Sequence, residues 1–240
     1  MLKIFFKGSI KQSPERAISS TLNGPSNKMN RVLDGANAMS QGMPYIPGAT
    51  TVGVVCRDAV LLASERRLSY GYFVMSKSAR KVFTISETIG AAFAGLVSDM
   101  QILSKEATAY ANLYSYEKDR PITVKATAKM VGNLLFQRRM LPYITQTIIA
   151  GIDEDGPSLY VLDLLGSVIP DRFASVGSGS EIAMGVLEDE YKDNMSIEEA
   201  KALVAKSVKS ALARDAASGD GVDLLLITKT GIKEETMKLP

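Results

Sequence analysis

Residues 45–67 read YIPGATTVGVVCRDAVLLASERR. Two apolar runs rich in Val, Leu and Ala are typical of β-strands, and the Arg57-Asp58 pair between them predicts a tight hairpin. The first run begins directly after a Pro-Gly break, 48 residues into the chain. This abrupt start indicates that the preceding segment is not part of the same packed domain. The Gly48–Ala49 junction is therefore a candidate place for the chain to be cut.

The first 48 residues differ in composition from the rest of the chain. They are rich in Ser, Asn, Gly and Pro, and six Lys or Arg against two Asp or Glu give them a net charge of +4. The remainder has a net charge of −2, which does not indicate a basic nucleic-acid surface. We predict a flexible leader, or propeptide, over residues 1–48 and one domain over residues 49–240.

Composition also excludes several classes of protein. With 240 residues, 46% of them apolar, and no apolar run of about 18 residues, the chain is expected to be a soluble globule without a membrane anchor. The single cysteine, Cys56, excludes an internal disulfide and a multi-cysteine zinc site, and it favours a cytoplasmic location. We expect no metal or organic cofactor.

The chain contains no histidine. This absence excludes a Ser-His-Asp or Cys-His catalytic group, an HExxH zinc helix and any imidazole general base. If the chain belongs to a hydrolase family, its general base must be an amine or a carboxylate.

The order of the predicted elements is strands, two helices, strands, two helices and a strand. Ser98 or Asp99 is expected to cap the first helix, Pro121 to lie in the first turn of the second, and Ser196 with Glu199 to form a capping box in the last. The predicted strands cover 50–56, 59–65, 73–86, 88–95, 144–153, 158–166, 171–179 and 222–229, the last of which closes the domain. The predicted helices cover 98–118, 121–140, 180–192 and 196–216. Clustered helices favour an α+β fold in which two antiparallel sheets lie face to face and helices cover both outer sides.

Six segments together resemble the proteasome β-subunit family, most closely its archaeal type. They are TTVGVVCRDAVLLASERR (50–67), KSARK (77–81), AFAGLVSD (92–99), GIDEDGPSLYVLDLLGS (151–167), VGSGS (176–180) and RDAASGDGVDL (214–224). The resemblance spans residues 49 to about 232 with the segments in family order. It implies the four-layer αββα sandwich of the N-terminal nucleophile hydrolases, which is consistent with the order of elements.

The resemblance also implies partners. Members form seven-membered β rings that stack between α-subunit rings, so the expected partners are α subunits and other β subunits of the same or a different kind. An ATPase regulator would act indirectly, and unfolded polypeptides would be the substrates. Neither nucleic acid nor membrane is expected as a partner.

Family members are threonine endopeptidases that need no histidine. The N-terminal threonine uses its own α-amine, with a pKa of roughly 7.7–8.0, as the general base. That amine exists only after the leader has been removed by self-cleavage, so maturation and activation are one event.

The site residues implied by the resemblance can be placed one at a time. Lys81 matches the lysine that favours the deprotonated hydroxyl, Glu65 matches the acid that holds this lysine, and Arg67 lies beside it. Gly95 matches the glycine whose N–H faces the developing oxyanion. The residues that match hydrogen-bonding groups around the nucleophile and its amine are Ser178, Asp215 and Ser218. The residues expected around an apolar specificity pocket are Leu68, Ala79, Phe93 and Val97.

The nucleophile position departs from the family pattern. The family reads Gly followed by Thr-Thr-Thr-Val-Gly, whereas this chain reads GATTVG over residues 48–53. An ungapped match puts Ala49, which has no hydroxyl, where the nucleophile belongs. The chain is then either a naturally silent subunit or a precursor trapped by replacement of Thr with Ala.

Two alternatives stay open. Cleavage after Ala49 would make Thr50 the nucleophile, but a one-residue shift along a strand moves the hydroxyl by about 3.3 Å and toward the other face. The chain could also be a purely structural ring subunit that performs no chemistry.

Overall fold

The computed structural model describes residues 48–70 and 72–237, so residues 1–47 of the predicted leader lie outside the described residues. Two five-stranded antiparallel sheets form the centre of the described domain. The first has the order β10-β1-β2-β11-β12, built from Phe173–Val176, Thr51–Val55, Ala59–Glu65, Val222–Thr228 and Gly231–Met237. The second has the order β5-β6-β7-β8-β9, built from Val82–Ser86, Ile89–Gly95, Thr145–Asp153, Gly156–Leu162 and Val168–Asp171.

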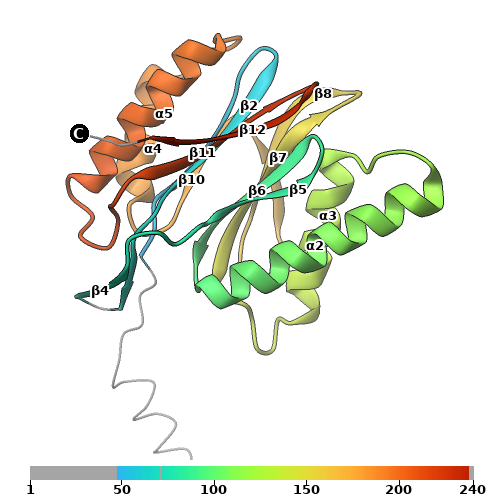
Figure 1. The fold of residues 1–240 in the computed structure, drawn as a ribbon, viewed down its shortest axis with the longest axis horizontal. Helices are drawn as coiled ribbons and strands as arrows, with labels where there is room; N and C mark the ends of the chain where they lie inside the picture. Colours follow the sequence, from blue (N-terminus) through green and yellow to red (C-terminus); the bar gives the residue numbers. More distant parts are fainter. Residues whose placement is uncertain (1–47, 71, 238–240) are drawn as a thin grey trace, which may run out of the picture. The chain divides into compact units, whose positions relative to one another are not determined.

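The helices cover the outer faces of the two sheets (Figure 1). Helices α4 (Ser180–Glu190) and α5 (Ile197–Leu212) pack against the first sheet through one apolar cluster, and α2 (Val97–Lys118) and α3 (Val124–Gln137) pack against the second through another. The predicted four-layer αββα sandwich is therefore confirmed. No helix among the described residues is long and apolar enough to cross a bilayer.

A third apolar cluster fills the space between the two sheets. The side chains of β1 alternate, so Val52 and Val54 face α5 in the outer cluster while Ala49, just before the strand, belongs to the inter-sheet cluster. Antiparallel pairing with β2 aligns Thr51 with Ser64. The chain thus runs from Ala49 in the inter-sheet cluster into β1, which lies between β10 and β2 in the first sheet.

Several predicted boundaries were wrong. Helix α2 begins at Val97 after Leu96, without a side-chain cap, because the Asp99 carboxylate accepts a hydrogen bond from Ile144 N–H at 2.8 Å. Helix α3 begins at Val124, and the Thr123 hydroxyl, rather than Pro121, marks its start.

Two predictions about strands also need correction. The strand β11 does not close the domain, because the polar strand β12 pairs with it along the outer edge of the first sheet. The strand predicted over 73–86 is divided into β4 (Phe73–Ser76) and β5. Strand β4 pairs with β3 (Leu68–Tyr70) in a separate two-stranded sheet. The capping box of Ser196 and Glu199 is confirmed at the start of α5.

Candidate active site

Ala49 enters the first sheet between two groups of hydrogen-bonding partners. Its N–H donates to Ser178 Oγ at 3.1 Å, and its carbonyl accepts from Gly179 N–H at 3.2 Å. Its methyl group is fully buried in the inter-sheet cluster. The turn after β10 therefore holds the backbone of Ala49 on both sides.

A chain of hydroxyls and one carboxylate runs behind this turn. Asp215 Oδ2 accepts from Ser178 Oγ at 2.6 Å and from Ser218 Oγ at 2.7 Å, and Oδ1 accepts from Ala217 N–H at 3.0 Å. Since Ser218 donates its single proton to the carboxylate, the Thr50 hydroxyl, 2.9 Å away, donates to Ser218 Oγ. The structure thus brings the three predicted residues Ser178, Asp215 and Ser218 together around Ala49 and Thr50.

Ala49 and Thr50 present their side chains to opposite faces of the sheet, as strand alternation requires. The Thr50 hydroxyl lies against Gly179, next to Ala211 of helix α5, where any β-carbon added to Gly179 would clash with it. The Ala49 methyl group instead faces the second sheet. A hydroxyl at position 49 would therefore face the second sheet, whereas the hydroxyl of Thr50 faces helix α5.

Lys81 and Glu65 form an ion pair whose side chains are completely buried. Lys81 Nζ donates to Glu65 Oε1, to Arg67 O at 2.6 Å and to Glu65 O at 3.2 Å. Glu65 lies opposite Thr50, since its N–H donates to Thr50 O at 3.1 Å. The lysine therefore reaches the part of β2 that pairs with the start of β1, although the two residues come from different sheets.

Hydrogen bonding indicates the charge state of this pair. Burial raises the pKa of Glu65 and lowers the pKa of Lys81, and their mutual attraction opposes both shifts. Glu65 Oε2 accepts from the N–H groups of Arg67 at 2.6 Å and Gly219 at 3.0 Å, and both bonds favour the carboxylate form. Three acceptors around Lys81 Nζ match the three protons of an ammonium. The arrangement is that of an ionised pair sealed from water.

Arg67 connects this pair to the loop that carries Asp215 and Ser218. Its Nε donates to Asp220 Oδ2 at 2.8 Å, and a second guanidinium nitrogen donates to Ala216 O at 3.0 Å. The hydrogen bond from the guanidinium holds the pKa of the Asp220 carboxyl below its usual value. Arg67 is thus placed to position the loop rather than to touch a substrate.

Gly95 ends strand β6 with a backbone that favours glycine. Its φ is +139°, and a β-carbon there would clash with the Ile144 carbonyl. Because Leu96 N–H donates to Ile144 O and Phe93 N–H donates to Lys81 O, ladder alternation directs Gly95 N–H away from β7. It faces the side of β5, which begins as a strand only at Val82.

The four residues predicted to line a specificity pocket come from separate elements. Phe93 is buried in the cluster beneath α2, with its ring 5.6 Å from that of Phe83. Leu68, Ala79 and Val97 are half-buried, from β3, the segment before β5 and the first turn of α2. The apolar pocket that the resemblance implies around these four residues stays a prediction.

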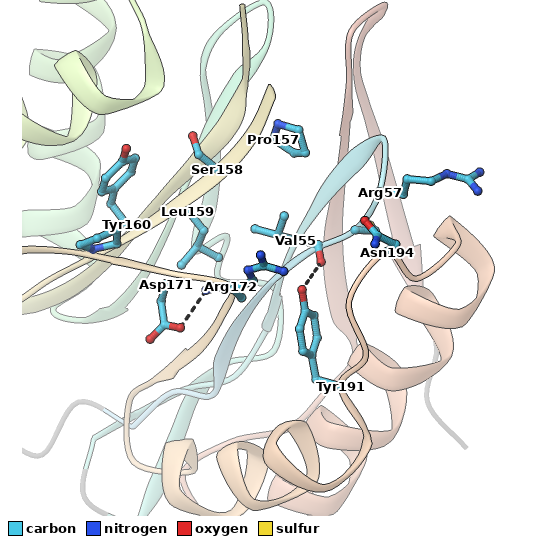
Figure 2. A pocket seen from close by; sticks show the side chains of 12 residues that line it. Val55, Arg57, Pro157, Ser158, Leu159, Tyr160, Asp171, Arg172, Tyr191 and Asn194 are labelled. Carbon is cyan, nitrogen blue, oxygen red and sulfur yellow. Dashed lines mark hydrogen bonds between the residues drawn. The ribbon is translucent and has the colours of Figure 1, made fainter. Parts of the chain in front are cut away.

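A hollow of about 350 Å³ lies at the other end of β1 and contains none of the predicted site residues (Figure 2). Tyr191 OH points across it and donates to Val55 O at 3.1 Å. Its two arginines, Arg57 and Arg172, each pair with a neighbouring carboxylate, Asp58 and Asp193. The described residues contain no group of three or more His, Cys, Asp or Glu that could hold a metal ion. The candidate site is therefore the Ala49 end of the strand.

Sequence reasoning missed three contributors to this site. Gly177 packs so closely on the Ala49 carbonyl that a β-carbon would clash with it, and Gln146 Oε1 accepts from Gly177 N–H at 2.8 Å. Thr51 Oγ1 donates to Phe93 O at 2.8 Å and so links the two sheets. The only available signal was the GSGS segment, which by itself predicts no more than a turn at the start of a helix.

Replacement of Gly177 with Ala is expected to lower the free energy of unfolding by at least about 1–3 kcal/mol, because φ is +102° and the Ala49 carbonyl occupies the space. Urea unfolding of the purified chain measures this. Gly185→Ala on helix α4 is the matched control, because a β-carbon meets nothing within 4 Å there, and it should stabilise the helix by up to about 1 kcal/mol. Equal effects of the two substitutions would contradict the close packing of Gly177 on Ala49.

Comparisons with known proteins match most of the chain. Residues 47–227 match the family model described as "Proteasome subunit". The chain is 44% identical over 201 residues, 84% of this chain and 100% of the relative, to "Proteasome subunit beta 2" of Caldivirga maquilingensis. It is 46% identical over 195 residues, 81% of this chain and 98% of the relative, to "Proteasome subunit beta 1" of Nitrosopumilus maritimus. A third relative, "Proteasome subunit beta 2" of Thermofilum pendens, is 44% identical over 197 residues, 82% of this chain and 96% of the relative.

Proposed function

The chain belongs to the proteasome subunit family as a β-type subunit of the 20S core, and on this premise we propose that it is a member without a nucleophile of its own. The family consists generally of threonine peptidases and assembles with α subunits. In this chain Ala49 stands at the position of the catalytic threonine, so the chain neither removes its own leader nor cleaves peptides.

The hydrogen bond from Ala49 N–H to Ser178 Oγ is the observation that carries this proposal. In a processed N-terminal nucleophile hydrolase the general base is the α-amine of the nucleophile itself. The groups suited to orient such an amine are Ser178 and the Asp215 carboxylate behind it, and they meet the nitrogen of residue 49. The ungapped register therefore has support in geometry as well as in sequence.

The surroundings of residue 49 support the same proposal. The ammonium of Lys81 is held by Glu65, at the point where β2 pairs with the start of β1. Gly95 directs its N–H away from β7, where it could stabilise an oxyanion. These surroundings support a site from which only the nucleophile's hydroxyl has been lost.

Thr50 is a poorer candidate for the nucleophile. Its hydroxyl donates to Ser218 Oγ and lies against Gly179 and Ala211, on the face that meets α5. To act as nucleophile after cleavage at Ala49, it would have to turn toward the inter-sheet face.

We further propose that the chain takes its place in a seven-membered β ring of the cytoplasmic core particle, beside β subunits that do carry the nucleophile. Unfolded polypeptides would be the substrates of that particle, and an ATPase regulator would deliver them. The contribution of this subunit is then to complete the wall of the chamber.

Intact-mass measurement of the chain isolated from the assembled particle tests the absence of self-processing. We expect no species that begins at Ala49 or Thr50 when the chain is assembled with α subunits alone. We also expect no labelling by an inhibitor specific for N-terminal threonine. A mature chain that begins at Thr50 and reacts with the inhibitor would instead make Thr50 the nucleophile and overturn the proposal.

A further inference from the structure

Gln146 connects the two sheets at the mouth of the candidate site. It lies on β7, two residues before Ile148, so its side chain leaves the strand on the same face as the inter-sheet cluster. Its Oε1 accepts from Gly177 N–H at 2.8 Å, and Gly177 follows β10 of the opposite sheet. This hydrogen bond is a side-chain link between the sheet that carries Gly95 and the turn that holds Ala49.

The turn of residues 177–179 contacts the backbone of Ala49 at three points, so a shift of the turn is expected to shift Ala49 as well. Gly177 packs on the Ala49 carbonyl, Ser178 Oγ accepts from Ala49 N–H at 3.1 Å, and Gly179 N–H donates to Ala49 O at 3.2 Å. The position of residues 177–179 therefore fixes the backbone of residue 49.

The other end of the link is attached equally closely to the oxyanion glycine. Gln146 pairs with Ala94 across the β6–β7 ladder, and Thr145 pairs with Gly95. A β-carbon on Gly177 would lie 2.9 Å from the Ala94 methyl group, so the turn and β6 are also in direct contact. Gln146 thus lies between the 177–179 turn, which contacts Ala49, and the end of β6, which carries Gly95.

We propose that Gln146 is a positioning residue: its carboxamide oxygen holds the 177–179 turn at the spacing from Gly95 that the chemistry of this site requires. The catalytic part of this inference rests on the proposed function of the site. Errors of about 1 Å in such spacings can cost on the order of 100-fold in rate. A single hydrogen bond that sets the spacing between the two sheets can therefore have a large effect on the rate. The proposal depends on the acceptor, because the backbone N–H of Gly177 donates to this oxygen.

The first test uses the chain as it is, with Ala49 in place. Amide hydrogen exchange at Gly177 is compared among the parent, Gln146→Met and Gln146→Glu. Met has nearly the same size and no strong acceptor, whereas Glu keeps an oxygen at the same reach. We expect exchange at Gly177 to accelerate about 2- to 10-fold in the Met variant, as loss of one such bond implies, and to stay near the parent rate in the Glu variant. Equal exchange in all three chains would overturn the link.

The second test adds Gln146→Met to an Ala49→Thr chain. We expect kcat to fall by about 10- to 100-fold with KM changed less than threefold, because the change misplaces reacting groups without removing substrate contacts. An unchanged kcat would overturn the positioning role, even if exchange at Gly177 accelerates. If Ala49→Thr alone is inactive, the proposed function fails instead, and the exchange comparison decides by itself whether Gln146 holds the turn.

Discussion

Ala49→Thr is expected to produce a chain that removes its own leader and cleaves peptides. The new hydroxyl would lie on the inter-sheet face. Lys81 is held where β2 pairs with the start of β1, and its 3.2 Å bond to Glu65 O, the longest of its three, is the one that we expect it to exchange for the hydroxyl. Once the leader is gone, the α-amine of residue 49 meets Ser178 Oγ and acts as general base. The substitution supplies the one component that the site lacks.

Two measurements test whether Ala49→Thr gains self-cleavage and peptidase activity. Intact mass should show a chain that begins at residue 49, and peptidase activity should exceed that of the parent by about 10³-fold or more, since loss of a nucleophile elsewhere costs on the order of 10⁶. The rate should rise with pH toward roughly 7.7–8.0, because only the neutral amine can accept the proton.

Ala49→Val is the matched control for this experiment. Val has the shape of Thr without the hydroxyl, so it introduces the same bulk into the inter-sheet cluster and should stay uncleaved and inactive. A folded Ala49→Thr chain that behaves like the Val chain would contradict the ungapped register. Cleavage in both chains would show that another residue, or another subunit, performs the cut.

Local signals allowed most of the fold to be predicted from the sequence. The capping box of Ser196 and Glu199 and the β1–β2 hairpin depend on neighbours in the chain, and both are present. Failures came where distant residues intervene. Asp99 does not cap α2 because its carboxylate is bound by Ile144 N–H, 45 residues away in sequence. Strand β12 was missed because an edge strand of Lys, Glu and Thr lacks the apolar pattern that marks a buried strand.

The candidate site depended almost wholly on resemblance. Taken alone, Glu65 and Lys81 look like surface charges, yet both side chains are completely buried, one on β2 of the first sheet and the other just before β5 of the second. No periodicity predicts that pairing, since it arises only when the sheets stack. Gln146 gave no signal of any kind, because a polar residue on a strand is ordinary until its partner across the gap is known. The catalytic roles assigned to these residues remain predictions.

Lys81→Met is expected to lower the free energy of unfolding by about 3–5 kcal/mol, because it leaves the Glu65 carboxylate buried without its counter-ion. The backbone N–H groups of Arg67 and Gly219 still reach that carboxylate but cannot neutralise it. Lys206→Met is the matched control, since its pair with Glu190 is largely exposed and should be worth less than about 1 kcal/mol. Urea unfolding of the purified chains measures both values.

The double variant Lys81→Met with Glu65→Gln separates charge from packing. Gln removes the uncompensated charge and keeps an oxygen for Arg67 or Gly219 N–H, so the double variant should be more stable than Lys81→Met alone by about 1–3 kcal/mol. If Lys81→Met costs no more than Lys206→Met, the pair is not the sealed ion pair described above. In that case Lys81 could not supply the fixed positive charge on which the gain of activity in Ala49→Thr depends.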